Sequence, residues 1–417
     1  MQKLFLLLAV VTVVFSAACK ADAPQTAVPP FLKLMLPEVI YAAPGIESNI
    51  YFENIIDSAT PRNYAVEVKC PRGSQYSDRW FWTPEPEDSG KSFDMEIRLF
   101  NDYGMLLSKR AKIIVAKASA DRKRKFTLAL LADSITNCGY PAHMLNVMRE
   151  HGFINYIPVG SHTAFGKIGK KGSVLHDGYG GFSWSEFQNR WLYNADELPP
   201  LQNRAEREQM LAFGIKNLPK SEAYRLRSPL LRIVNGKKVL DIPAWLKKIN
   251  QGKAPDFIVF QLGTNDISSA TPETIKTHYE KVRKNAASLL AALRKHAPDA
   301  VIGITTGICG CSQDGFGANY RTRLTRYQYR RNIHYYNRKI AEFIKQQKDS
   351  KLILIPIHQA IDPVSGYITG MVNINARNKK QVRLDRNALH PAKEGGYQIG
   401  DAICCWLWNM LDKFPEK

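Results

Sequence analysis

The sequence lacks a long apolar run beyond its first 18 residues, so we expect no membrane-spanning helix in the mature protein. It also lacks the paired cysteine and histidine spacing of a zinc site. Cys309-Gly-Cys311 and Cys404-Cys405 have no matching pair of histidines, so we expect no metal. No nucleic-acid-binding motif, internal repeat or long low-complexity segment is present, and we expect no nucleic-acid partner.

Acidic residues are scarce relative to basic ones. The chain of 417 residues has 58 Lys and Arg against 38 Asp and Glu, a formal net charge of +20. Basic clusters occur at residues 122–125, 167–171 and 379–380. Such clusters are commonly solvated surface, and the alternative is attraction to a polyanion. An acidic polysaccharide or an anionic membrane surface suits an exported protein better than nucleic acid.

The N-terminus has the pattern of an export signal. Lys3 precedes an apolar run that ends at Phe15, and Ser-Ala-Ala stands directly before Cys19. We expect residues 1–18 to be a signal peptide, with Cys19 either lipidated as the mature N-terminus or removed by ordinary cleavage. The protein would then be periplasmic, secreted or an outer-membrane lipoprotein, touching a membrane only through a lipid on Cys19. Six further cysteines, an even number, would permit disulfides in an oxidising compartment.

Residues 19–33 form a linker, and residues 34–120 have strand patterns. The stretches YAVEVKC, DMEIRLF and AKIIVAK alternate apolar and polar residues between turn-rich segments. This pattern predicts a small all-β, sandwich-like domain. Its aromatic cluster, Trp80, Phe81 and Trp82, is either a platform for stacking sugars or ordinary packing, and we favour packing.

Residues 126–412 change to short apolar runs that alternate with amphipathic stretches. The runs FTLALLA, DFIVFQLG, AVIGITTG and KLILIPI are typical of buried parallel strands. Strand–helix alternation predicts an α/β domain whose parallel sheet is covered by helices, with its ligand site at the carboxyl ends of the strands. A charge-rich insertion at about 185–251 would form a lid over that site.

Four polar clusters follow these strands or close the domain. They contain Ser134 in ADSIT, Gly181 in HDGYGGFSW, Asn265 in QLGTND and His390 in NALHPAKEGG. Ser134 alone would be interpreted as a helix N-cap. The four together provide what acyl transfer needs: a hydroxyl, an imidazole to take its proton, and donors for the oxyanion, namely the N–H of Ser134, a glycine N–H and the Asn265 amide.

These clusters resemble the four blocks of the SGNH (GDSL-like) hydrolase family. ADSIT is similar to its GDSIT, GTND is identical to its third block, and the last cluster resembles its D-x-x-H-P. The resemblance implies a flavodoxin-like three-layer α/β/α fold and metal-free ester hydrolysis. It implies Ser134 as nucleophile, His390 as general base, and Gly181 and Asn265 as oxyanion donors.

Two positions depart from the family pattern. Ala132 replaces a glycine, which should leave the chemistry unaffected, and Asn387 stands where the family has an aspartate. Either Asp385, two residues earlier, supplies the charge, or Asn387 orients His390 in a Ser–His dyad. We favour the dyad because Asn387 holds the motif's position.

Four further residues are predicted to bind substrate: Asp133, Gly180, His176 and Asp266. A β-domain before such a hydrolase domain, in an exported protein, resembles bacterial carbohydrate esterases. We therefore expect a serine esterase that removes O-acetyl groups from a polysaccharide, which an acidic polymer would suit. The alternatives are a lipolytic esterase or thioesterase acting on lipid acyl chains, and a catalytically idle carbohydrate-binding protein.

Overall fold

The computed structural model describes residue 28 and residues 31–163, 174–190, 228–235 and 237–414. Several expected features lie outside these residues: the signal peptide, Cys19, most of the linker, the basic cluster at 167–171 and the central part of the expected lid (191–227). Within the described residues, no helix is long and apolar enough to cross a membrane.

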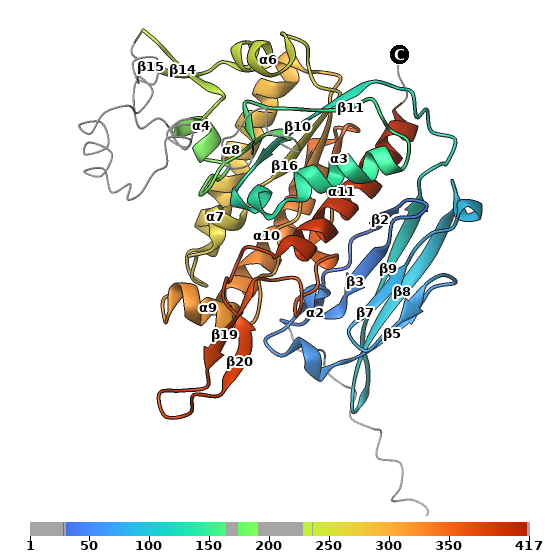
Figure 1. Cartoon of the computed structure of the whole chain (residues 1–417), viewed down its shortest axis with the longest axis vertical. Helices are drawn as coiled ribbons and strands as arrows, with labels where there is room; N and C mark the ends of the chain where they lie inside the picture. Colours follow the sequence, from blue (N-terminus) through green and yellow to red (C-terminus); the bar gives the residue numbers. More distant parts are fainter. Residues whose placement is uncertain (1–27, 29–30, 164–173, 191–227, 236, 415–417) are drawn as a thin grey trace, which may run out of the picture.

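The N-terminal domain consists of two β-sheets with a shared apolar core (Figure 1). The first sheet has the strand order β2 (Val39–Ala42), β9 (Gly104–Val115), β8 (Ser92–Asn101), β5 (Ala65–Lys69). The second has the order β3 (Ser48–Tyr51), β7 (Arg79–Trp82), β6 (Ser74–Gln75). A short pair, β1 (Lys33–Leu34) and β4 (Ile56–Asp57), lies beside them. The expected N-terminal β-domain is confirmed.

Alternation along the strands explains how this domain forms a core. In β8, Met95, Ile97 and Leu99 are buried while their neighbours are less so, as expected for a strand with one face inward. Trp80 and Trp82 of β7 are also buried in this core. Two of the three clustered aromatics therefore pack inside the domain and are not available for stacking on a sugar.

The second domain is an α/β domain around a seven-stranded, mostly parallel sheet. Its strand order is β12-β13-β10-β16-β17-β18, and β11 also pairs with β10. The strands are β10 (Phe126–Ala132), β11 (Tyr156–Val159), β12 (His162–Thr163), β13 (Leu175–Gly178), β16 (Phe257–Gln261), β17 (Val301–Thr305) and β18 (Leu352–Ile355). All residues of β16 and β17 are buried, which is why the sequence shows continuous apolar runs here and no alternation.

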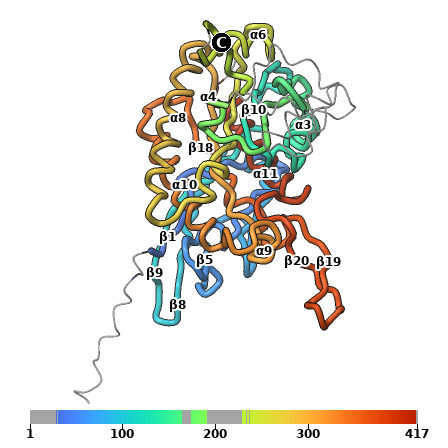
Figure 2. Tube along the Cα trace, turned by 90° about the vertical axis from the view of Figure 1, so that its left-hand side faces the viewer, coloured from blue at the N-terminus to red at the C-terminus, as the bar shows by residue number. Residues whose placement is uncertain are grey.

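Helices cover both faces of this sheet (Figure 2). On one face lie α3 (Tyr140–Glu150) and α11 (Lys393–Lys413), which pack against each other. On the other lie α8 (Ile275–His296) and α10 (Arg326–Gln347). The expected three-layer α/β/α architecture is confirmed.

Shorter elements surround this framework. The helices among them are α2 (Phe52–Ile55), α4 (Glu186–Asn189), α6 (Ile242–Asn250), α7 (Thr264–Ile267) and α9 (Gln313–Tyr320). The 3₁₀ turns are η1 (Pro61–Asn63), η2 (Pro86–Asp88), η3 (Ser134–Cys138) and η6 (Ile357–Gln359). Two hairpins complete the fold: β14 (Leu231–Val234) with β15 (Lys237–Leu240), and β19 (Thr369–Asn373) with β20 (Gln381–Asp385).

The two domains are joined by buried polar contacts. Arg330 of α10 donates a hydrogen bond to the backbone oxygen of Glu53 (2.6 Å), and Asn409 of α11 donates to the backbone oxygen of Ala42 (2.9 Å). The Glu53 side chain, 6% exposed, forms ion pairs with Arg62, Arg326 and Arg330. Because a buried charge is costly unless it is paired, this cluster ties α2 firmly to α10.

Each cysteine that the structure describes is a free thiol: Cys70, Cys138, Cys309, Cys311, Cys404 and Cys405. The disulfides that their even number permitted are therefore not formed among them. Burial raises the pKa of the Cys309 thiol to about 11, which disfavours its reactive thiolate.

Candidate active site

Ser134 lies where β10 ends, at the first position of η3. The N-cap of this turn is Asp133, whose Oδ1 accepts a hydrogen bond from the Ile135 backbone N–H (2.9 Å). The capping role is therefore filled by the residue before the serine. The Ser134 hydroxyl is directed elsewhere: its Oγ lies 2.7 Å from Nε2 of His390. This is the distance at which an imidazole can take a proton from a hydroxyl.

His390 comes from a loop between β20 and α11. Its Nδ1 lies 3.0 Å from Oδ1 of Asn387, which also accepts from the backbone N–H groups of His390 (3.0 Å) and Leu389 (3.3 Å). Three donors around one oxygen fix the Asn387 amide with its oxygen toward the ring, and a hydrogen on Nδ1 leaves Nε2 free to accept from Ser134. Burial lowers the pKa of His390, which favours the neutral imidazole that a base requires.

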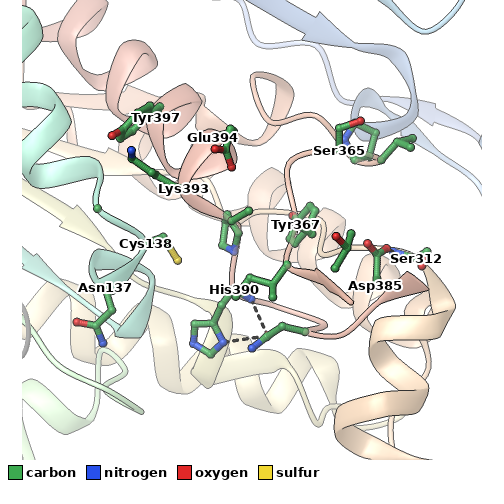
Figure 3. A pocket seen from close by; sticks show the side chains of 18 of the residues that line it. Asn137, Cys138, Ser312, Ser365, Tyr367, Asp385, His390, Lys393, Glu394 and Tyr397 are labelled. Carbon is green, nitrogen blue, oxygen red and sulfur yellow. Dashed lines mark hydrogen bonds between the residues drawn. The ribbon is translucent and has the colours of Figure 1, made fainter. Parts of the chain in front are cut away.

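Asp385 is held away from this histidine. It is the last residue of β20, 7% exposed, and its Oδ2 accepts a hydrogen bond from the backbone N–H of Ser312, the residue before α9 (2.9 Å). In this arrangement Asn387, and not Asp385, contacts the imidazole. Figure 3 shows Asp385 beside Ser312 and away from the His390 ring.

The register of the parallel sheet brings the other candidate residues to the same edge. Ala132 of β10 pairs with Gly178 of β13 on one side and with Gln261 of β16 on the other. Ser134, Gly181 and Asn265 each follow one of these paired residues by two to four positions. Three segments far apart in the sequence therefore meet at the carboxyl ends of adjacent strands.

Gly181 and Asn265 belong to two loops that are bonded together. Gly181 has a φ of +77°, and a Cβ there would meet only Arg190 Nη1 at 3.8 Å, so the left-handed backbone and not space requires glycine. The Asn265 amide nitrogen donates to the Phe182 backbone oxygen (2.8 Å). One of its two hydrogens is engaged there, and the side chain is exposed, so the role of Asn265 as an oxyanion donor stays a prediction.

The sequence model of the GDSL-like Lipase/Acylhydrolase family matches residues 161–403, more than half of the chain. The protein is a GDSL-like hydrolase. The matched residues include Gly181, Asn265, Asn387 and His390, whereas Ser134 lies before them, so its place in the site depends on its motif and on its contact with His390. As a member of this family, the protein is an enzyme that hydrolyses ester bonds.

Solved structures similar to this hydrolase include several carbohydrate esterases. A family 3 carbohydrate esterase from Clostridium thermocellum has 11% identity and a TM-score of 0.37, covering 70% of this chain and 100% of its own. The acetyl xylan esterase AlAXEase has 14% identity and a TM-score of 0.33, covering 66% and 97%. A family two carbohydrate esterase from Clostridium thermocellum, in complex with cellohexaose, has 13% identity and a TM-score of 0.33, covering 89% and 94%. A comparison with curated protein sequences gives no match.

The structure corrects two of the predicted substrate contacts. Asp133 is 0% exposed and His176 is 1% exposed, so neither side chain can reach a ligand. Burial raises the pKa of Asp133 to about 7 and lowers that of His176 to about 3. Asp133 instead caps η3, and His176 accepts a hydrogen bond from the Gly178 backbone N–H (3.0 Å). Both side chains bond to backbone N–H groups next to the catalytic motifs, so they shape the local turns and do not contact a ligand.

The other two predicted substrate contacts, Asp266 and Gly180, are associated with the loop that contains Gly181. The Asp266 carboxylate accepts a hydrogen bond from the Trp184 backbone N–H (3.2 Å), and burial raises its pKa to about 7. It therefore holds the loop of Gly181 against α7. Gly180 lies in the same loop and is partly exposed. A substrate contact at Gly180 or Asp266 stays a prediction.

A pocket of about 1470 Å³ opens beside Ser134 and His390. Figure 3 shows Lys393, Glu394 and Tyr397 of α11 to one side of His390, and Tyr367 and Asp385 to the other. The charged and imidazole side chains in its lining come from both domains: Arg62, His143, Asp314, Arg326, Arg383, Asp385, His390, Lys393 and Glu394. The hydrolase therefore has a wide approach to its serine, in which charged side chains from both domains stand among apolar surface.

Some of these lining residues carry no motif that marks them in the sequence. Arg62 comes from η1 of the β-domain, more than 70 residues before Ser134, and it reaches the pocket only because the domains pack together. His143 of α3 lies 2.7 Å from Asp401 Oδ1 and stacks on Tyr397, with ring centroids 4.1 Å apart. Its position nine residues after Ser134, one helix turn into α3, is a signal that could have placed it near the site.

Proposed function

We propose that this hydrolase removes acetyl groups from a polysaccharide, using Ser134 and His390 as a catalytic dyad. The observation that carries the proposal is the 2.7 Å contact between Ser134 Oγ and His390 Nε2 at the edge of a wide pocket with charged walls. A small acyl group needs little space beside the serine, whereas a sugar chain needs a broad polar surface next to it. A long lipid chain would need a continuous apolar groove, and charged side chains from both domains interrupt the apolar surface of this pocket.

The reaction would proceed in two steps that share one base. His390 Nε2 takes the proton of Ser134 Oγ as this oxygen bonds to the acetyl carbonyl carbon. The negative charge on the carbonyl oxygen is met by the N–H groups of Ser134 and Gly181 and by the Asn265 amide. When the C–O bond to the sugar breaks, His390 returns the proton to the departing sugar oxygen. Water then attacks the acetyl-serine by the same route, and acetate leaves.

Asn387 would act by orienting the base. Its Oδ1 accepts from His390 Nδ1, so the ring presents an unprotonated Nε2 to the serine. It supplies no negative charge to stabilise the imidazolium that forms during the reaction, in contrast to the aspartate of a triad. We therefore describe the machinery as a dyad with a neutral orienting residue.

The decisive test is turnover of p-nitrophenyl esters of increasing chain length by the full-length protein. Highest kcat/KM on the acetate ester, together with release of acetate from an acetylated polysaccharide, supports the proposal. Preference for long acyl chains would indicate a lipolytic esterase or thioesterase. No turnover on any ester would indicate an idle carbohydrate-binding protein.

Export is a separate part of the proposal. It depends on the signal-like residues 1–18 and on the cleavage box before Cys19. Mass spectrometry of the mature protein tests it, because a lipidated N-terminal Cys19 and an unmodified N-terminus differ in mass by the acyl chains. An intact Met1 in fractionated cells would overturn it.

A further inference from the structure

The β19–β20 hairpin is a strongly basic arm that projects from the body of the hydrolase (Figure 1). Between residues 368 and 386 there is one acidic residue, Asp385, whose carboxylate is occupied by the Ser312 N–H. The same segment carries five basic residues, and the structure assigns none of them an ion pair among the described residues: Arg377, Lys379, Lys380, Arg383 and Arg386.

One face of this hairpin continues the wall of the catalytic pocket. Thr369 pairs with Asp385 and Met371 pairs with Arg383, so these four side chains share a face. Three of them, Thr369, Arg383 and Asp385, line the pocket that contains Ser134 and His390. Met371 lies one step further out on the same face and is 52% exposed. A ligand that leaves the pocket in this direction would therefore meet Arg383 as the first basic side chain on this face.

No acidic side chain that the structure describes forms an ion pair with Arg383. The guanidinium donates a hydrogen bond to Thr369 Oγ1 (3.2 Å), which leaves most of its five N–H groups free. Arg62 and Arg326 line the same pocket but are both paired with Glu53. Exposed carboxylates are present too, at Asp314 and Glu394, but these belong to α9 and α11 and not to the hairpin.

We infer that the β19–β20 hairpin binds an anionic polysaccharide, with Arg383 contacting a sugar carboxylate next to the residue that is deacetylated. This rests on the proposed esterase function and names its substrate class. A guanidinium matches a carboxylate in shape and can donate two parallel hydrogen bonds. The lysines and Arg377 at the hairpin tip then attract the following carboxylates of the chain by their charge.

An anionic membrane is the competing occupant, because the arm also exposes Met371 and Ile374. The placement of Arg383 favours the polysaccharide. Arg383 lies on the hairpin face that continues into the pocket of Ser134. A hairpin whose tip only binds a membrane would not need a charge beside that pocket. A chain of acidic sugars would also extend along the hairpin. Asn373 and Gln381 are exposed on the same face as Arg383 and would lie along its path.

The test measures binding and turnover separately. Binding of polygalacturonate and of neutral xylan is measured by affinity electrophoresis, with Ser134→Ala as the background. Turnover is measured as the ratio of kcat/KM on acetylated pectin to that on acetylated xylan. The variants are Arg383→Gln and the tip variant with Arg377, Lys379 and Lys380 changed to Gln. The matched control is Lys295→Gln, which removes one exposed charge at the end of α8.

We expect Arg383→Gln to weaken polygalacturonate binding and to lower the turnover ratio, each by about fivefold to tenfold. The tip variant should mainly flatten the dependence of binding on salt, because its charges act at longer range. Lys295→Gln should change neither measurement. Circular dichroism checks that each variant is folded.

Each remaining outcome has one meaning. Equal binding of both polymers by the parent, or an unchanged ratio in Arg383→Gln, overturns the hairpin proposal. Binding to vesicles that contain phosphatidylglycerol, with no polygalacturonate binding, also overturns it in favour of a membrane. If no ester is turned over but Arg383 still controls polygalacturonate binding, the hairpin proposal stands and the proposed esterase function fails.

Discussion

The two sides of the Ser134–His390 pair, which we call the strand-end side and the hairpin side, are built differently. On the strand-end side, Ser134, Gly181 and Asn265 follow three adjacent strands whose ladder is buried in the main core. On the hairpin side, His390 follows a two-stranded hairpin that lies outside the sheet. Here the chain is held by hydrogen bonds outside the sheet, such as the Ser312 N–H to Asp385 and the Ala388 N–H to Asn319 Oδ1 (2.7 Å), and by Ala388 and Leu389, which are buried in the main core.

This difference shows which part of the site depends on the main sheet and which part does not. The strand-end side cannot shift without breaking parallel pairing and core packing. The strands β19 and β20 pair only with each other, so a change in the length or charge of the hairpin would leave the pairing of the main sheet intact. An orienting asparagine and a basic arm both occur on that side. Four predictions test the contrast, from the largest expected effect to the smallest.

Ser134→Ala should abolish ester hydrolysis and leave the fold unchanged. Loss of a true nucleophile lowers kcat by about a thousandfold or more. The measurement is kcat on p-nitrophenyl acetate, with thermal unfolding as the check on folding. The control is Ser108→Ala, an exposed serine of β9 in the other domain. Residual activity above about a tenth of wild type would rule out Ser134 as nucleophile.

Asn265→Ala should lower kcat by about a hundredfold or more, because one oxyanion donor is lost. KM should change little, since the donor acts on charge that develops only in the transition state. The control is Asn155→Ala, a partly exposed residue whose amide donates a hydrogen bond to the Lys123 backbone oxygen. A rise in KM with kcat preserved would show that Asn265 only holds the Phe182 loop.

Much of the strand-end side could be predicted from sequence because its signals are local. ADSIT and GTND each join an apolar run to a polar turn, and the apolar run itself indicates a buried strand. The substrate contacts predicted for Asp133 and His176 are wrong, because a local sequence pattern does not show whether a side chain is buried. Burial depends on what packs above a side chain, and that comes from distant segments.

The hairpin side was only partly predictable. His390 and Asn387 were identified from their motif, but the sequence left open which residue orients the histidine. The answer depends on Ser312, more than 70 residues away, which occupies the Asp385 carboxylate. Arg62 reaches the pocket through domain packing, and no pattern within one domain indicates that.

The choice between Asn387 and Asp385 gives the third prediction. Asn387→Ala should lower kcat by about tenfold to a hundredfold, because His390 Nδ1 loses its partner and the ring can turn to the wrong tautomer. Asp385→Ala should have a smaller effect, because its carboxylate contacts the Ser312 N–H and not the imidazole. The reverse order of the two losses would mean that Asp385 supplies the missing charge during the reaction.

The last prediction concerns the pH at which the hydrolase becomes active. Burial lowers the pKa of His390, so the imidazole stays neutral to a lower pH than a free histidine, and neutral imidazole is the form that takes the serine proton. The acid limb of the kcat/KM profile should therefore lie below about pH 6.5. Asn387→Asp places a negative charge beside Nδ1 and favours the imidazolium. The limb should then move to higher pH by about one unit, with a modest rise in the plateau as the charged ring is stabilised.

The measurement is a pH profile of kcat/KM on p-nitrophenyl acetate for the wild type and Asn387→Asp. Asn155→Asp is the matched control, because it adds the same charge at a partly exposed position on the loop before β11. An acid limb that moves equally in both variants would mean that the shift reflects net charge alone. A limb that does not move in Asn387→Asp would mean that the base is not the imidazole which Asn387 contacts. Movement in Asn387→Asp alone would show that the hairpin side sets the working pH, while the strand-end side supplies the nucleophile and the oxyanion donors.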